Sequence, residues 1–215
     1  DFVTTRDMSD TQNYEQVKEM MDVENYLQYF CANLYLANAF YGEDTVMTWR
    51  TISENGTGFG DGRWRFLMCR LDNSMGNNAT GGKTTATIDS YLMESVSQDI
   101  FFRALLHNEE FRNSLSSVMQ EMAEHTFAEE EVEAVLGQLA AEKKKIVLSN
   151  YKRFRGNIED TVYHQEVKKI EEFFRERESY ILRYTQEVAE GTVNWDAEIP
   201  PEQTAAEEGT ENLNE

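Results

Sequence analysis

Apolar residues recur at intervals of three and four along most of this chain, and this spacing constrains the fold more than any other feature. Residues at such intervals lie on one face of a helix that packs against a core. The pattern predicts a helix from about Glu15 to Phe40, broken near Met21, with Asp22 as the N-cap of its second part. The residues that carry the pattern are Val17, Met20, Met21, Leu27, Phe30, Leu34 and Ala37.

The second half of the chain is predicted to be helical as well. We expect one helix from about Tyr91 to Leu106 and another that begins after Asn108, which is a good N-cap. Thr126 and Glu129 have the spacing of a capping box and predict the start of a third helix. The last helix is expected from about Thr161 to Val188.

Two short strands are predicted between these helical regions. They run from Val46 to Arg50 and from Arg63 to Cys69, and the segment between them, Ser53 to Gly62, contains four glycines. Two strands joined by a glycine-rich turn are typical of a β-hairpin. A second polar, glycine-rich loop is expected from Asp72 to Lys83. The predicted fold class is therefore α+β and predominantly α-helical, with a small β-hairpin.

The chain is strongly acidic, and its charge excludes some classes of partner. Its 215 residues have a formal net charge of −20, which repels nucleic-acid phosphates and anionic lipid surfaces. We therefore expect no nucleic-acid partner, and no membrane insertion because no run of about 18 apolar residues occurs. Eight acidic residues, no Lys or Arg and both prolines lie between Glu190 and Glu215. We expect residues 1–188 to form the domain and residues 189–215 to be an acidic disordered tail or linker.

Several catalytic and metal-binding motifs are missing from the sequence. His107, His125 and His164 have neither the His-Glu-x-x-His arrangement nor zinc spacing, and no Gly-x-Ser-x-Gly elbow occurs. The run from Gly81 to Thr85 is similar to the end of a phosphate-binding P-loop. Asn77 stands where that motif needs its first glycine, so we interpret the run as a flexible loop.

The two cysteines, Cys31 and Cys69, are too few for a disulfide framework or a four-cysteine zinc site. Both lie in apolar runs, and we interpret them as two buried thiols. A single bridge between them is the alternative, and it needs Cα atoms within about 7 Å of each other.

A basic run stands out in this acidic chain. We interpret it as a solvated helix face that balances the acidic helices around it, with a site for a phosphate or an acidic partner as the alternative. The run consists of Lys143, Lys144, Lys145, Lys152, Arg153 and Arg155.

Polar residues between Asn38 and Asp72 have the chemistry of a metal–nucleotide site. Glu43 and Asp44 follow the first long helix, and Asp72 follows the second strand. A helix–loop–hairpin–loop arrangement can bring Asn38, Asp44 and Asp72 to one edge. Mg²⁺ prefers oxygen ligands, and one or two side chains with phosphate oxygens suffice. Local roles in turns are the alternative explanation for these residues.

The segments DVENYLQYFCANLYLANAFYGEDTVMTWR (Asp22 to Arg50) and GRWRFLMCRLDNSMG (Gly62 to Gly76) resemble the CotH kinase family, the spore coat protein H family. That family has a helix beginning Asp-Val-x-Asn, a loop with an aspartate and paired asparagines, and a Trp-Arg/Tyr strand that runs into Asp-x-Asp. The segments DIFFRALLHNEEFRNSL (Asp99 to Leu115) and VKKIEEFFRERESYI (Val167 to Ile181) resemble its later helices. The resemblance covers roughly Val17 to Tyr184.

The resemblance implies the helical, C-terminal part of an atypical protein-kinase-like fold. It also implies ATP and a divalent metal, Mg²⁺ or Mn²⁺, for the phosphorylation of coat or surface proteins on serine. The implied location is extracellular or on the surface of bacterial spores or cells. The chain has no signal peptide, and it begins in a polar stretch typical of a cut inside a longer protein.

The resemblance assigns family roles to individual residues. Asn38 matches the asparagine that opens the family loop, and the loop aspartate, the expected catalytic residue, falls at Phe40. The paired asparagines fall near Asp44, which can donate oxygen to a metal. The first aspartate of Asp-x-Asp falls at Arg70 and the second at Asp72. The resemblance thus implies cofactor contacts by Asn38 and Arg70 and metal ligands in Asp44 and Asp72.

Two of these positions depart from the family pattern in a way that opposes catalysis. Phe40 has no acid–base capacity, and Arg70 puts a positive charge where a metal ion would lie. The leading hypothesis is therefore a degenerate kinase-fold protein, a secreted or surface module that binds coat or surface proteins or has a structural role. One alternative is an active ATP- and metal-dependent protein serine kinase that uses Asp44 and Asp72. A helical interaction domain unrelated to kinases is the other, and the sequence assigns no oligomeric state.

Overall fold

The protein is described by a computed structural model that covers residues 2–41, 46–52, 58–77, 86 and 99–192. Antiparallel strands β1 and β2 pair Met47 with Leu67 and Trp49 with Arg65. The predominantly helical α+β class and the hairpin are confirmed, while assignment to a kinase-like lobe stays a prediction. The elements are α1 (Phe2–Thr5), α2 (Thr11–Met20), α3 (Val23–Tyr35), β1 (Met47–Trp49), β2 (Arg65–Leu67), α5 (Ile100–Leu105), α6 (Glu109–Glu121), the π-helix η1 (Met122–Thr126), α7 (Glu129–Arg155) and α8 (Asp160–Ala189).

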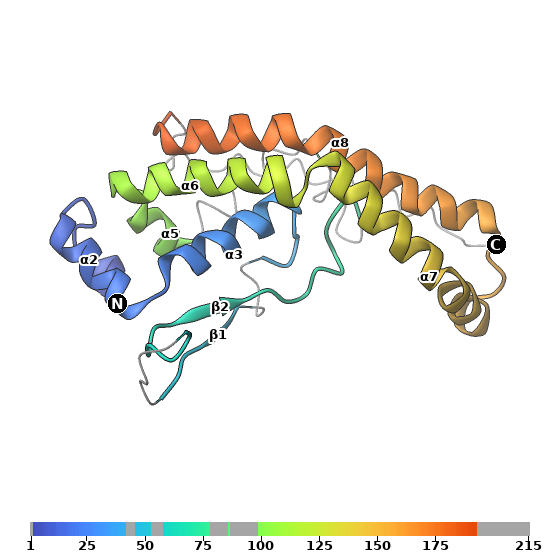
Figure 1. Cartoon of the computed structure of the whole chain (residues 1–215), viewed down its shortest axis with the longest axis horizontal. Coiled ribbons are helices and arrows are strands. Elements are labelled where there is room, and N and C mark those ends of the chain that lie inside the picture. The colour runs from blue at the N-terminus through green and yellow to red at the C-terminus, as the bar shows by residue number, and fades with distance from the viewer. Residues whose placement is uncertain (1, 42–45, 53–57, 78–85, 87–98, 193–215) are drawn as a thin grey trace, which may run out of the picture.

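The helices form a body from which a helical pair and the hairpin project (Figure 1). Helix α6 packs between α3 and the C-terminal half of α8. Helix α7 continues from α6 after the η1 turn, leaves the body and packs along the first half of α8. The hairpin lies on the other side of α3, where β2 contacts that helix.

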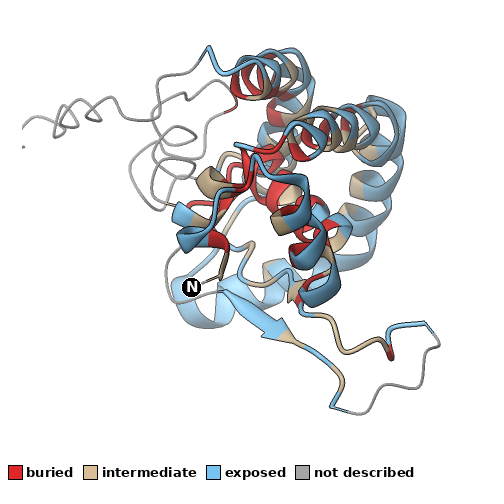
Figure 2. Ribbon diagram, turned by 90° about the vertical axis from the view of Figure 1, so that its left-hand side faces the viewer, coloured by how far each residue is buried: buried red, intermediate tan, exposed pale blue. Residues whose placement is uncertain are grey.

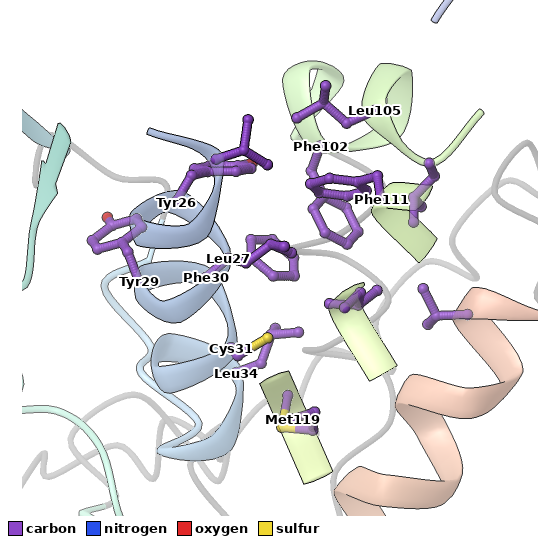
Figure 3. Packing of buried hydrophobic residues seen from close by; sticks show 14 of the residues in the cluster. Tyr26, Leu27, Tyr29, Phe30, Cys31, Leu34, Phe102, Leu105, Phe111 and Met119 are labelled. Carbon is purple, nitrogen blue, oxygen red and sulfur yellow. The ribbon is translucent and has the colours of Figure 1, made fainter. Parts of the chain in front are cut away.

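The core is built around the aromatic face of α3. Tyr26, Phe30, Phe102 and Phe111 are each 2 % exposed or less, and Figure 3 shows them converging from α3, α5 and α6. The rings of Phe30 and Phe102 stack with centroids 3.7 Å apart. Figure 2 shows the buried residues gathered on the inward faces of the helices. The apolar residues that recur at helical spacing in α3 and α6 therefore form the buried faces of these helices, as expected for amphipathic helices that pack against a core.

Two of the predicted helix starts are confirmed and one is wrong. The Asp22 side chain accepts from the backbone of Asn25 at the start of α3, and that of Asn108 accepts from Phe111 at the start of α6. The capping box does not form. Thr126 lies inside η1, and α7 begins after Ala128 without a side-chain cap. The extra residue of the π-turn shifts the start of α7 beyond the position that the pattern predicts.

Cys31 and Cys69 form no disulfide, so the disulfide alternative is wrong. Cys31 is fully buried, and this burial raises the pKa of its thiol far above the ordinary value. Cys69 is half-buried, so the prediction of a buried thiol is confirmed for Cys31 alone.

Some predictions fall outside the described residues. These include the run Gly81–Thr85, the first part of the helix expected from Tyr91, and most of the tail after α8, which ends at Ala189. Among the helices that the structure describes, none is both long and apolar enough to cross a membrane.

Candidate functional site

Two loops meet at the end of α3, and they carry the residues that the sequence singles out. The first loop (residues 36–41) follows α3, and the second loop (residues 70–77) follows β2. The backbone N–H of Ala39 donates to the carbonyl of Asn73 at 3.0 Å, and that of Met75 donates to the carbonyl of Leu36 at 2.9 Å. These contacts place the loop that carries Asn38 beside the loop that carries Asp72, while Asp44, the third residue of the predicted edge, lies outside the described residues.

The backbone of both loops is locally strained. Ala37, Arg70 and Met75 have φ angles of 47°, 53° and 53°. They are the non-glycine residues with positive φ in the described part of the chain. Gly76 adopts a φ of 80° in the same turn, where a side chain would be disfavoured. Strained backbone of this kind clusters at functional sites and is held in place by the surrounding structure.

The side chains of Phe40 and Arg70 form the centre of the site. The Arg70 guanidinium carbon lies 3.9 Å from the centroid of the Phe40 ring, within the range of a cation–π contact. Its Nε lies 3.8 Å from Oδ1 of Asp72. The side chain of Arg70 is 52 % exposed and that of Asp72 is 70 % exposed. The Arg70 guanidinium therefore lies between the Phe40 ring and the Asp72 carboxylate and faces solvent. The resemblance expects acidic residues at the positions of Phe40 and Arg70.

Asn38 lies beneath the site and shapes the first loop. It is 1 % exposed. Its Nδ2 donates to Oδ1 of Asn33 at 2.8 Å, and its Oδ1 accepts from the backbone N–H of Phe40 at 3.2 Å. The bond to Phe40 closes a local turn of the kind that Asn side chains favour. The structure thus gives Asn38 a role in positioning Phe40, and a cofactor contact by Asn38 stays a prediction.

The described part of the site places one predicted metal ligand, Asp72, beside a cation, Arg70. Asp72 is the predicted ligand in this part, and its carboxylate already faces Arg70. Among the residues that the structure covers, no group of three His, Cys, Asp or Glu side chains comes together. Asp44, the other predicted ligand, lies outside the described residues. The exposed guanidinium of Arg70 has the chemistry to contact an anion such as a phosphate.

Asp99 ties the first loop to the core, a role that no sequence motif indicated. Its Oδ2 accepts from the hydroxyl of Tyr41 at 2.6 Å and from that of Tyr26 at 3.3 Å. Its Oδ1 accepts from the backbone of Phe101 and Phe102 as the N-cap of α5. We expected a helix running through this position, which hid the capping aspartate. Burial raises the pKa of Tyr26 well above its ordinary value, and the neighbouring Tyr41 and Asp99 add to the effect.

Arg177 fixes the end of α3 from the opposite side. It is fully buried, and its Nε donates to the carbonyl of Tyr35 at 2.9 Å. Its Nη2 donates to the carbonyl of Leu34, and its Nη1 donates to that of Ala86 at 2.7 Å. The last carbonyls of a helix lack partners within the helix, and a cation there also matches the helix dipole. The Phe-x-x-Arg sequence of α8, from Phe174 to Arg177, thus places this arginine directly behind the first loop, where it has a structural role.

The motif Asp-Val-x-Asn at the start of α3 docks the hairpin. Asp22 accepts from Nε of Arg65 at 2.9 Å. The Asn25 amide accepts from the backbone N–H of Phe66 at 2.7 Å. Arg65 also forms a two-point pair with Asp61, and this contact lowers the pKa of the Asp61 carboxyl. The position of the second loop thus depends on contacts at the first turn of α3.

One of three comparisons with known proteins identifies a family for the chain. A sequence model of the family described as CotH kinase protein matches residues 1–181. Searches of curated proteins and of solved structures returned no match to the chain. The family match spans most of the 215 residues and includes both loops, the hairpin and the Phe-x-x-Arg helix. The chain therefore belongs to the CotH kinase protein family.

Proposed function

We propose that this chain is a CotH domain with a degenerate kinase site and that it serves as a binding or structural module. The observation that supports this proposal most directly is the contact between Arg70 and Phe40 at 3.9 Å. Their positions are those at which the family resemblance expects a metal-binding carboxylate and a catalytic carboxylate. The ring has no acid–base capacity, and it holds the Arg70 guanidinium, from the second loop, against the first loop.

The charges of Asp72 and Arg70 have opposite effects on the binding energy of a metal ion at this position. Two unit charges 4 Å apart interact by about 4 kcal/mol at an effective dielectric constant of about 20. A divalent ion at that distance from both side chains gains about 8 kcal/mol from the Asp72 carboxylate and loses about 8 kcal/mol to the Arg70 guanidinium. Little net attraction is left to offset the loss of the ion's hydration shell. The arginine therefore replaces the metal ion as the local cation.

We propose a location outside the cell or on a spore or cell surface, with coat or surface proteins as partners. Family membership supports the surface context. The net charge of −20 favours basic partner proteins, because an acidic field raises their local concentration and their rate of association. The charge disfavours nucleic acids and anionic lipids for the same reason.

The second candidate function is an active protein serine kinase that uses ATP with Mg²⁺ or Mn²⁺. The exposed carboxylate of Asp72 favours it, since that oxygen is accessible to a metal–nucleotide complex. Asp44 would supply the second ligand. This candidate needs Arg70 to move away from Phe40 or to contact a phosphate of the nucleotide directly.

Thermal melting of the natural full-length protein tests the two candidates. A ligand that binds only the folded state at 100 times its Kd stabilises that state by about 2.7 kcal/mol. We expect no rise in Tm with ATP and Mg²⁺ or Mn²⁺ beyond the change seen with the metal alone. A rise that needs both ATP and metal, together with transfer of phosphate to serine in a coat or surface extract, would establish the kinase candidate instead.

A binding experiment tests the module itself. The protein, fixed to a support, should retain one or a few defined proteins from a spore-coat or surface extract, identified by mass spectrometry. An unrelated acidic protein of similar net charge is the control, because charge alone captures basic proteins. Recovery of the same proteins on both supports, or of none, would count against the binding role.

A further inference from the structure

Helix α7 is unusual because it has no buried residue along its 27-residue length. It is about 40 Å long at 1.5 Å per residue. Its main packing neighbours among the described elements are α8 and η1. Lys144 contacts Asp160, the first residue of α8, at 2.6 Å, so residues 145–155 extend beyond the start of α8. Figure 1 shows this end of α7 projecting from the molecule.

An apolar stripe runs along the exposed side of α7. Val135, Leu139 and Ile146 are 55 %, 45 % and 65 % exposed. Their spacing of four and seven places them on one helix face, and Glu142 lies between the last two. Beyond them, Phe154 is 70 % exposed near the end of the helix. Side chains of this size repeated along one helix face are typical of an interaction surface.

The charges of α7 are separated into two blocks. Residues 129–142 contain five glutamates and no basic residue, and residues 143–155 contain six basic residues and no acidic one. The helix dipole favours acidic residues in the first turn and basic residues in the last turn, and its effect fades beyond those turns. It therefore does not account for the change of sign between Glu142 and Lys143 in the middle of the helix.

We infer that α7 is a self-association helix that pairs with α7 of a second copy in the antiparallel direction. An antiparallel pair with its two-fold axis near Glu142 and Lys143 sets the acidic block of each helix against the basic block of the other. In that register, Leu139 lies opposite Ile146 of the second copy, and Glu131 lies one residue, about 1.5 Å along the helix axis, from the position opposite Arg153 of the second copy. The same patch serves both subunits, as an interface with two-fold symmetry requires.

The acidic tail of the same chain is a weaker candidate for this surface. Its acidic residues complement the basic block alone, and they would oppose the five glutamates of the first block. The tail would therefore match half of the surface, whereas a second α7 matches both halves and covers the stripe with equivalent apolar residues. Charge complementarity over the whole helix favours the second copy.

Sedimentation velocity of the full chain over a concentration series tests this inference. At about 0.15 M salt the Debye length is about 8 Å, so the repulsion between two chains of charge −20 is largely screened. We expect a species of twice the 24.9 kDa chain mass. The variant Ile146→Asp should be monomeric, and Ile100→Asp is the matched control because Ile100 is similarly exposed, at 67 %, on α5. Circular dichroism should show native helix content in both variants.

Charge reversal gives a second test that does not depend on the apolar stripe. The acidic block is reversed by Glu131→Lys with Glu142→Lys, and the basic block by Lys143→Glu with Arg153→Glu. Each double variant should be monomeric alone, because like charges then face each other, and an equimolar mixture should restore the dimer. A full chain that stays monomeric at every concentration, as when the tail covers α7, would overturn the inference. A dimer that persists in Ile146→Asp, or a mixture that does not associate, would overturn it as well.

Discussion

The guanidinium of Arg70 lies 3.9 Å from the centre of the Phe40 ring, and this contact joins the two residues that depart from the family pattern. Either change alone would leave an arginine beside acidic neighbours or an aromatic ring at the edge of a polar loop. Together they form a compact pair that connects the loop after α3 to the loop after β2. The two departures from the expected pattern thus lie in one contact, which supports the proposed degenerate kinase site.

The Phe40–Arg70 contact predicts a measurable coupling energy. A double-mutant cycle with Phe40→Leu and Arg70→Gln should give about 0.5–1 kcal/mol of interaction, the range for exposed cation–π pairs. Urea unfolding of the four proteins measures it. A cycle that combines Arg70→Gln with Phe154→Leu is the control, since the C-terminal end of α7 lies away from the two loops (Figure 1), and it should be additive. Additivity in the first cycle would show that the contact contributes nothing.

Asp99 should be more important for stability than an ordinary helix cap. It accepts from two backbone N–H groups and from the hydroxyls of Tyr26 and Tyr41. Asp99→Ala removes the cap and leaves a buried hydroxyl without its acceptor, for a loss of about 3 kcal/mol in unfolding free energy. Asp10→Ala is the matched control, because Asp10 is an exposed N-cap that accepts from Gln12, and it should cost about 1 kcal/mol. Equal losses would contradict the role of Asp99 in holding the first loop.

Arg177 should tolerate neither Met nor Lys. Its guanidinium donates to three carbonyls while fully buried, and a lysine ammonium cannot reproduce the planar geometry. Arg177→Met should lower the unfolding free energy by at least about 3 kcal/mol, and Arg177→Lys should rescue little of it. Arg183→Met, an exposed position on the same helix, should stay within about 0.5 kcal/mol. Chemical denaturation of the three variants provides the comparison, and near-native stability of Arg177→Lys would refute the three-carbonyl role.

Buried tyrosines predict alkaline unfolding. Burial is the main cause that raises the pKa of Tyr14, Tyr29 and Tyr35 from 10.0 to about 12. The unfolded chain keeps the ordinary value, so it loses these protons first, and the unfolding free energy falls as pH rises from about 10 to about 12. Tyrosinate absorbance at these residues should therefore appear together with loss of the circular dichroism signal. Three tyrosines that titrate near pH 10 in a chain with native circular dichroism would contradict the burial argument.

Much of the fold could be predicted from the sequence because burial leaves a periodic pattern. Asp22 and Asn108 were recognisable as caps, since an N-cap is a local feature that precedes a run of core residues. The capping box at Thr126 failed because Thr126 lies inside the π-helix η1, and α7 begins only after Ala128. The exposure of α7 could not be predicted either, because its apolar residues have a helical period whether or not a partner covers them.

The candidate site was located from the sequence, but its internal contacts were not. The meeting of the two loops followed from the order of helix, hairpin and loop. The contact of Arg70 with Phe40 could not be predicted, because it joins loops 30 positions apart whose backbones adopt positive φ at Ala37 and Arg70. Asp99 and Arg177 were missed for the same reason, since each acts through backbone or hydroxyl partners distant in the sequence.

Manganese-induced paramagnetic broadening tests the central claim most directly. Mn²⁺ with ATP should leave the amide signals of Asn73 and Ser74, next to Asp72, no more broadened than those near exposed acidic residues such as Glu15. The variant Arg70→Asp removes the resident cation and adds a second carboxylate, so its Asn73 and Ser74 signals should broaden selectively at the same metal concentration. Equal, selective broadening in the unaltered chain and in Arg70→Asp would show that Arg70 does not exclude the metal, and the degenerate-site account would be wrong.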